Sequence, residues 1–305
     1  MPKIHRFSKI LFLALFCALF VKTPVFASQR LQISPTSAHI ELSPTEPYSG
    51  SLRVSNIGDE TIEYEVSVSP FTVSDRDYVP NFDTLDLTIN AITKWISLSN
   101  ATGTLTPGAS TYVYYTVTTP ADAPSVGQYA ALLARITSKD NSGATVVANS
   151  RVAMPIYAAV AGNNREEGTI LKNSIQNIIF SAPLSASSVV KNTGNIHSDA
   201  SYALEVFNFF SEDLAYSNVA NPDTHTILPN TTRLVSVSWP DSPKLGLFTV
   251  RQTIKFIDQT SINEKLVFLC PTWLLFIFIF ALVVLILRIV VAIKKRKSNK
   301  KHFRF

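Results

Sequence analysis

Cysteine is nearly absent from this chain of 305 residues, which contains only Cys17 and Cys270. Both lie in apolar segments near the two ends, so residues 28–265 contain none. Small secreted animal domains usually depend on disulfides. Their absence favours a bacterial surface protein whose domains are stable through core packing alone.

Catalytic and metal-binding motifs are also lacking. His39, His197 and His225 are the only histidines between the two end segments, and they fall in unrelated parts of the pattern. Without a His-x-Glu, a His-x-x-x-His or a cysteine cluster, zinc and haem ligation have no support. There is no Gly-x-Ser-x-Gly elbow and no glycine-rich loop between a strand and a helix. We therefore predict a protein that is not an enzyme and carries no cofactor.

Acidic residues are missing from both ends of the chain. The whole chain has a net charge of +5 and a pI of 9.1, which suggests a nucleic-acid partner. However, residues 28–265 contain all 22 Asp and Glu against 15 Lys and Arg, a net charge of −7. A body of that charge has no phosphate-binding surface, so nucleic acid is excluded as a partner.

A long uncharged run lies near the C-terminus. Residues 266–287 carry no charge, and 22 helical residues reach about 33 Å, enough to cross the hydrocarbon layer of a membrane. We predict a transmembrane helix over residues 266–293 and a basic cytoplasmic tail over residues 294–305, since lysine and arginine stay on the cytoplasmic side. The predicted anchoring residues are Trp273, Arg288, Lys294, Lys295, Arg296 and Lys297.

The N-terminus fits an exported protein. Lys3, Arg6 and Lys9 precede an apolar run, and Val25 and Ala27 suit a cleavage site. We predict a signal peptide over residues 1–27, with an uncut signal anchor as the alternative. The predicted location is the cell membrane, crossed once, with the N-terminal body outside the cell and the tail in the cytoplasm.

The segments between these ends alternate apolar and polar residues and are rich in Val, Ile, Thr and Tyr, a pattern typical of antiparallel sheets packed over a core. An internal repeat divides them, because three features recur in the same order. The paired segments are 51–58 with 188–194, 105–113 with 228–235, and 126–129 with 245–248. In the first pair we attribute the Asn-x-Gly turn to residues that tolerate a positive φ.

This repeat predicts an all-β fold of two tandem immunoglobulin-like antiparallel β-sandwiches, over residues 28–163 and 164–265, followed by the transmembrane helix. The motifs Asn56-Ile-Gly58, Leu105-Thr-Pro-Gly108 and Thr118-Thr-Pro-Ala-Asp-Ala-Pro124 resemble those of immunoglobulin-like bacterial surface modules. The whole layout is similar to the WxL-interacting proteins of Gram-positive bacteria. That resemblance implies peptidoglycan binding by the first domain and binding of host or partner proteins by the second.

On this basis we expect a membrane-anchored binding or scaffold protein that contacts cell-wall polymer or another surface protein. Two alternatives remain. Residues 33–42, followed by a strand and Asn56-Ile-Gly58, resemble the opening of fimbrial chaperones, which complete the sheet of a client by strand donation. The other alternative is a passive structural stalk without a ligand.

The longest irregular stretch, residues 74–87, contains most of the candidate site residues. Asp75, Asp77, Asp83 and Asp86 either converge on Ca²⁺ or remain solvated loop carboxylates. Long loops on rigid sandwiches often carry recognition, and the candidates for a binding surface are Arg76, Tyr78, Asn81, Phe82 and Trp95. For Tyr78 and Phe82 the alternative is packing over the end of the core. Trp95 faces outward as a carbohydrate platform or inward as a core residue, the commoner position for aromatics.

Overall fold

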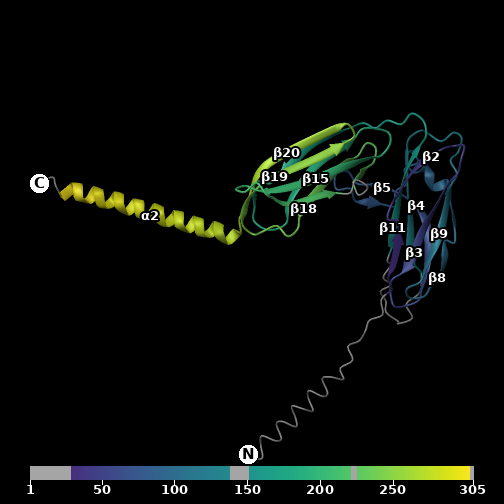
Figure 1. Ribbon diagram of the computed structural model, residues 1–305, viewed down its shortest axis with the longest axis horizontal. Helices are drawn as coiled ribbons and strands as arrows, with labels where there is room; N and C mark the ends of the chain where they lie inside the picture. Colours follow the sequence, from purple (N-terminus) through teal and green to yellow (C-terminus); the bar gives the residue numbers. More distant parts are fainter. Residues whose placement is uncertain (1–28, 138–150, 221–224, 303–305) are drawn as a thin grey trace, which may run out of the picture.

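The computed structural model describes residues 29–137, 151–220 and 225–302, and the side chains of its last helix up to residue 293. The predicted signal peptide lies outside these residues, as do the side chains of the basic tail. Figure 1 shows two β-sandwiches that meet at an elbow, with one long helix leaving the far end of the second. The predicted all-β immunoglobulin-like fold with one C-terminal helix is therefore confirmed.

The first sandwich packs a four-stranded sheet on a five-stranded sheet. The four-stranded sheet has the order β1 (Leu31–Ser34), β3 (Tyr48–Asn56), β9 (Ser110–Val117) and β7 (Ile96–Ser99). The five-stranded sheet has the order β2 (Ala38–Leu42), β11 (Arg151–Val160), β10 (Gly127–Ile136), β4 (Ile62–Pro70) and β8 (Thr102–Leu105). A small pair, β5 (Thr72–Val73) with β6 (Pro80–Asn81), and the 3₁₀ helix η1 (Ala91–Lys94) lie between β4 and β7.

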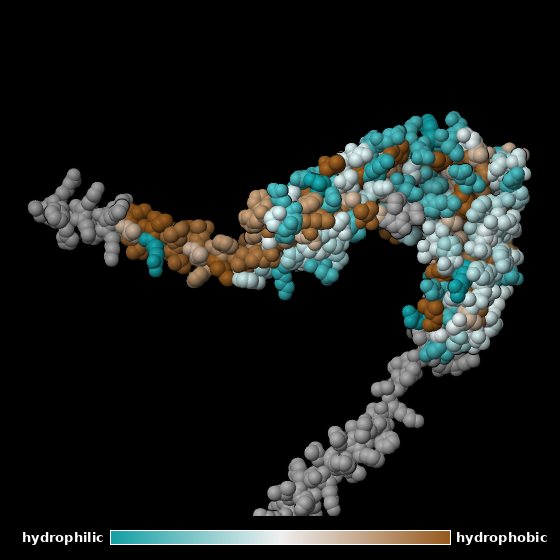
Figure 2. Space-filling model, viewed as in Figure 1, coloured by the Kyte–Doolittle hydropathy of each residue, from teal (hydrophilic) through white to brown (hydrophobic). Residues whose placement is uncertain are grey.

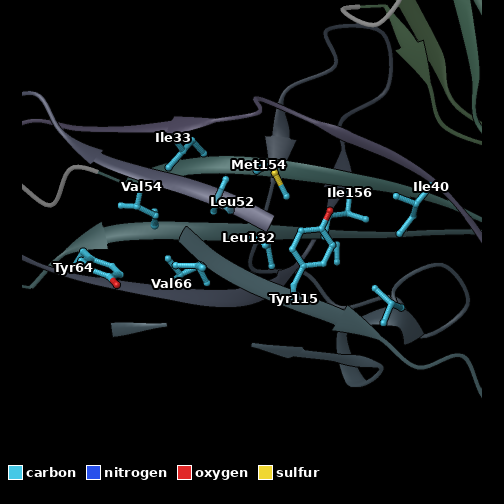
Figure 3. Close-up of a cluster of buried hydrophobic side chains, with 14 of the residues drawn as sticks. Ile33, Ile40, Leu52, Val54, Tyr64, Val66, Tyr115, Leu132, Met154 and Ile156 are labelled. Carbon is cyan, nitrogen blue, oxygen red and sulfur yellow. The ribbon is translucent and has the colours of Figure 1, made fainter. Parts of the chain in front are cut away.

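Alternation along the strands places one set of side chains between the two sheets. Leu52, Val54, Leu132, Met154 and Ile156 are fully buried there, and Figure 3 shows them pointing toward one another from facing strands. Burying each of these side chains stabilises the fold by about 1.5–3 kcal/mol.

The second sandwich repeats this design. One sheet has the order β12 (Gly168–Ile175), β14 (Leu184–Asn192) and β18 (Thr232–Trp239). The other contains β13 (Ile178–Ile179), β20 (Gln259–Leu269), β19 (Gly246–Phe256), β15 (Ser198–Asn208) and β16 (Leu214–Ala220), with β17 (Thr226–Ile227) paired to β15. Its own core includes Tyr202, Leu204 and Phe256, each at most 1% exposed.

The two Asn-x-Gly turns are equivalent, but for a different reason from the one we expected. The side-chain amide of Asn56 donates to the carbonyls of Glu60 and Leu105, at 2.7 and 3.0 Å, and its Oδ1 accepts from the Gly58 N–H. Asn192 makes the same three bonds, to Ile196, Ile227 and Gly194. Neither asparagine and neither glycine has a positive φ, so the expected left-handed turn is wrong. In each turn the buried asparagine side chain bonds two backbone carbonyls and one backbone N–H that have no partner within the turn itself.

Gly194 is constrained by a close approach. A Cβ at this position would lie 2.2 Å from the carbonyl oxygen of Arg165, in the segment that joins the two sandwiches. The backbone N–H of Gly194 donates to the carbonyl of Glu167 at 2.9 Å. The glycine thus lets the connecting segment lie directly against the turn.

The last helix, α2 (Thr272–His302), begins later than predicted. Residues 266–269 belong to β20, where Val267 and Leu269 are buried in the core of the second sandwich. The start predicted at Leu266 is therefore wrong, because the apolar end of a core strand runs directly into the apolar helix. Over Thr272–Ile293 the helix is long and apolar enough to cross a membrane.

Candidate functional site

The candidate site comprises the contact between the sandwiches and the edge of β11 that continues from it. β10, next to β11, is buried along almost its whole length, on both faces of its sheet. Leu132 and Ala134 face the core of the first sandwich, whereas Tyr129, Ala131 and Leu133 face a separate cluster with Phe71, Tyr157 and Leu228. Leu228 belongs to the second sandwich, so this outer cluster joins the two bodies.

The stretch after β4 covers this outer face. Asn90, fully buried, donates to the carbonyls of Phe71 and Tyr129 at 3.0 and 2.7 Å. Gln128, also fully buried, donates to the carbonyl of Thr88 at 3.0 Å. These bonds fix residues 71–90 on the sheet, because buried amide groups that lost them would remain unsatisfied.

Residues 75–78 extend from this stretch to the second sandwich. Arg76 forms a parallel bridge with Arg233: its N–H donates to the Thr232 carbonyl at 2.6 Å and its carbonyl accepts from the Leu234 N–H at 2.9 Å. The Asp75 carboxylate accepts from the Thr232 N–H at 2.6 Å. This is a backbone ladder across the elbow, with Arg76 held at a φ of 63°.

Tyr78 is the central side chain of the contact. Its hydroxyl accepts a hydrogen bond from the Leu228 N–H at 2.9 Å, and the Arg233 guanidinium lies 4.2 Å from the centre of its ring. Burial raises the pKa of the Tyr78 hydroxyl far above its usual value. The side chain is therefore neutral at physiological pH and acts as a structural acceptor.

A second group of rings closes the contact. His39 lies 4.8 Å from Tyr157 and 5.4 Å from His197, measured between ring centres. Burial, with His39 as a second cause, lowers the pKa of His197 to about 4. Asp199 lies 3.9 Å from the Nδ1 of His39. A pocket of about 340 Å³ lies beside these groups, between the sandwiches.

Asn195, next to this pocket in the sequence, holds the connecting segment. Its carbonyl accepts from the Gly127 N–H at 2.8 Å. Its Oδ1 accepts from the Arg165 N–H at 2.6 Å, and its Nδ2 donates to the Asn163 carbonyl at 2.9 Å. The sandwiches are thus bonded to each other through two separate segments, residues 75–78 and Asn195.

The binding-surface candidates occupy different environments. Tyr78 and Phe82 pack on the outer cluster, Phe82 at 5.9 Å from the Phe71 ring, so both take the packing alternative. Trp95 packs against the first core. Arg76 and Asn81 are exposed, but the backbone of Arg76 is bonded to the second sandwich.

The four candidate calcium ligands are not brought together. Asp75 bonds across the elbow, whereas Asp86 accepts from the hydroxyl and N–H of Thr88, which lowers the pKa of its carboxyl. Asp83 uses its backbone N–H in a turn with Asn81. Across the described residues, no group of three or more His, Cys, Asp or Glu is placed to hold a metal ion.

β11 has an open half. β10 pairs with residues 151–159 of this strand on one side, whereas on the other side β2 pairs only with residues 156–160. Within the described part of the chain, no strand pairs with residues 151–155 on that side. We call these five residues the open edge.

The backbone direction at the open edge follows from alternation. The Ala161 N–H donates toward β2, to the Leu42 carbonyl at 2.8 Å, whereas the Val160 N–H donates toward β10, to the Val126 carbonyl. Odd-numbered residues of β11 therefore direct their backbone groups outward. Pro155 fits this parity, since it has no N–H to give to β10. The outward donors at the open edge are those of Arg151 and Ala153.

Sequence reasoning did not identify the open edge, the contact of Arg233 with Tyr78, or the group of rings formed by His39, Tyr157 and His197. One signal was present: residues 130–134, Ala-Ala-Leu-Leu-Ala, do not alternate, which indicates a strand covered on both faces. The residues that cover the outer face come from the stretch after β4, about 40 to 60 positions away along the chain, and from Leu228 of the second sandwich, which the local pattern does not specify.

Comparisons with known proteins give distant matches. No family model matches the chain, and no curated protein matches it. Among solved structures, it is similar to the class 5 fimbriae chaperone CfaA, at 13% identity and a TM-score of 0.41, over 77% of this chain and 99% of that one. It is also similar to the CsuC–CsuE chaperone–tip adhesion subunit complex of Acinetobacter baumannii, at 12% identity and a TM-score of 0.37, over 77% of this chain and 98% of that one. A third similar structure is that of the Salmonella enterica SafA pilin with the SafB chaperone, at 11% identity and a TM-score of 0.38, over 81% of this chain and 99% of that one.

These three matches are fimbrial or pilus chaperones, two of them in complex with a pilus subunit. On this finding, the prediction of a binding or scaffold module that contacts cell-wall polymer is wrong. The resemblance to WxL-interacting proteins stays a prediction that none of these matches tests.

Proposed function

We propose that this protein is an assembly factor of the chaperone kind, which holds a secreted β-sheet client by pairing a strand of that client with the open edge of β11. The observation that carries the proposal is the set of outward backbone groups at residues 151–155. The neighbouring strand β2 begins only at Ala38, opposite Ile156, and leaves these residues unpaired on that side in the described part of the chain. Unpaired strand edges are templates for a further strand.

The side chains at the open edge suit an incoming strand. Val152 and Met154 point into the first core, and Ala153 packs on the outer cluster. An added strand extends both faces at once, so its alternate residues continue both apolar layers. The bonded elbow supports this, because a rigid platform lowers the entropic cost of ordering a client.

We also propose that α2 anchors this platform in the membrane, with the sandwiches outside the cell. The length and apolar character of Thr272–Ile293 support this, as do the basic residues that follow. The test is flotation of the full chain with vesicles after carbonate washing, combined with protease accessibility of the sandwiches in intact cells. A chain that washes off the membrane refutes the anchor.

A backbone substitution tests the client-binding role. Ala153→Pro removes an outward donor while leaving the bonds to β10, whereas Ala153→Ser keeps the donor and serves as the matched control. The probe is a purified pilin-type immunoglobulin-like domain from which one edge strand has been deleted. Aggregation of the probe is followed by light scattering, and the complex by size exclusion.

We expect the full chain and Ala153→Ser to suppress aggregation and to form a one-to-one complex, and Ala153→Pro to lose both activities with an unchanged unfolding midpoint. If the parent chain leaves aggregation of the probe unchanged, the assembly role is refuted. If Ala153→Pro still forms the complex, the open edge is not the binding site.

A further inference from the structure

The exposed apolar side chains of the second sandwich concentrate at the end from which α2 leaves. We call this the apolar end and define it by six exposed side chains. These are Ile178, Phe180, Phe209, Phe210, Leu214 and Leu245. Figure 2 shows the hydrophobic surface of the helix continuing onto the adjoining end of this sandwich.

Strand register places these residues at the level of the helix start. Ile178 pairs with Phe268, and the Cys270 N–H donates to the Ile179 carbonyl at 3.0 Å. The Phe209 N–H donates to the carbonyl of Leu247, itself paired with Phe268. The turn after β15, which carries Phe209 and Phe210, therefore lies level with the last residues of β20.

The tether between strand and helix is very short. β20 ends at Leu269 and α2 begins at Thr272, so only Cys270 and Pro271 separate them. Two extended residues span about 7 Å. If α2 crosses a bilayer, the apolar end is held within the thickness of the headgroup region.

Phe210 is the most exposed large side chain at this end, at 87%, and its ring packs edge-on against Phe209 at 5.2 Å. Neither of these two adjacent phenylalanines, in the turn between β15 and β16, belongs to the core of the second sandwich. Trp273, in the first turn of α2, is also exposed, and aromatic rings are enriched at membrane interfaces.

We propose that the apolar end docks on the outer surface of the bilayer, with Phe209 and Phe210 inserted among the lipid headgroups. The second sandwich then stands on the membrane, and the elbow presents the first sandwich to its client at a fixed height. This inference rests on the proposed membrane anchoring by α2 and not on the assembly role.

The charges at this end favour apolar insertion over electrostatic attraction. Glu212, Asp213 and Asp241 are exposed beside a single exposed lysine, Lys244, in these turns. This acidic balance does not attract anionic lipids. The contact is therefore expected to be insensitive to salt and to the fraction of anionic lipid.

The test uses the full chain reconstituted into vesicles. An NBD fluorophore is attached to Phe210→Cys and, as a matched control, to Val219→Cys. Val219 is 71% exposed on the same hairpin, five residues beyond Leu214, which places it about 16 Å farther from the apolar end. The parent chain, whose Cys270 is buried, gives the background labelling.

We expect the probe at 210 to emit at shorter wavelength and to be quenched several-fold more by shallow spin-labelled lipids than the probe at 219, in zwitterionic vesicles and at high salt alike. Equal, water-like emission at both positions in vesicles that retain the protein overturns the docking and leaves the anchor intact. Loss of the protein from the vesicles overturns both. Quenching that disappears at high salt also contradicts the proposal, because the contact is then electrostatic.

Discussion

The substitution Tyr78→Phe separates the two contacts that Tyr78 makes across the elbow. It removes the hydroxyl that accepts from the Leu228 N–H at 2.9 Å and keeps the ring under the Arg233 guanidinium. Leu228 is only 1% exposed, so its N–H cannot turn to bulk water instead.

The expected cost follows from that orphaned donor. A buried donor left without its partner costs about 1–3 kcal/mol, more than the net contribution of an ordinary hydrogen bond. With a urea slope of about 2 kcal/mol/M, the unfolding midpoint falls by about 0.5–1.5 M. The packing of the ring contributes nothing to this change, because phenylalanine retains it.

The assay is urea unfolding of the full chain in detergent, combined with hydrogen exchange of the peptide that contains Leu228. Tyr112→Phe is the matched control, because Tyr112 is 50% exposed and its loss of a hydroxyl should move the midpoint little. If Tyr78→Phe behaves like Tyr112→Phe, and the Leu228 amide stays protected, the hydroxyl does not hold the elbow together and the reasoning is wrong.

Three further substitutions test other parts of the structure. Leu132→Ala empties a fully buried site in the first core and should cost about 2–5 kcal/mol in unfolding free energy; a loss below 1 kcal/mol contradicts that packing. Asn192→Ala removes three buried hydrogen bonds and should cost about 3 kcal/mol, with Asn195→Ala as a half-buried comparison that should cost less. For His197, burial lowers the folded-state pKa from 6.5 to about 4, so stability is fully present above pH 6.5 and is lost as the pH falls toward 4. His197→Phe should flatten that part of the stability curve measured by thermal unfolding, and an unchanged acid limb refutes the role of this histidine.

Alternation was sufficient to predict the sandwich fold. Segments such as residues 62–68 and 235–239 alternate strictly, and the structure places both in strands with one buried face. The local rule holds because successive side chains in a strand point to opposite faces. The prediction failed where two apolar elements adjoin: hydropathy alone does not distinguish the buried end of β20 from the start of α2.

The candidate site was only partly predictable. Residues 74–87 stood out by length and composition, and they do carry the contact between the sandwiches. Their role as a free binding surface did not follow, because Tyr78 and Phe82 pack on the outer cluster. The outcome depended on Leu228 and Arg233, which lie about 150 residues farther along the chain.

The sequence by itself determined the strands, the apolar helix, the absence of disulfides in the body and the acidic charge hidden behind a basic pI. These properties are local or additive, so composition and short periodicities specify them. Only the tertiary structure decided that β10 is covered on both faces, that Arg76 pairs with the second sandwich, and that β11 keeps an open edge. Each of these depends on where one strand stops relative to a distant neighbour, and register between distant segments is set by packing in three dimensions.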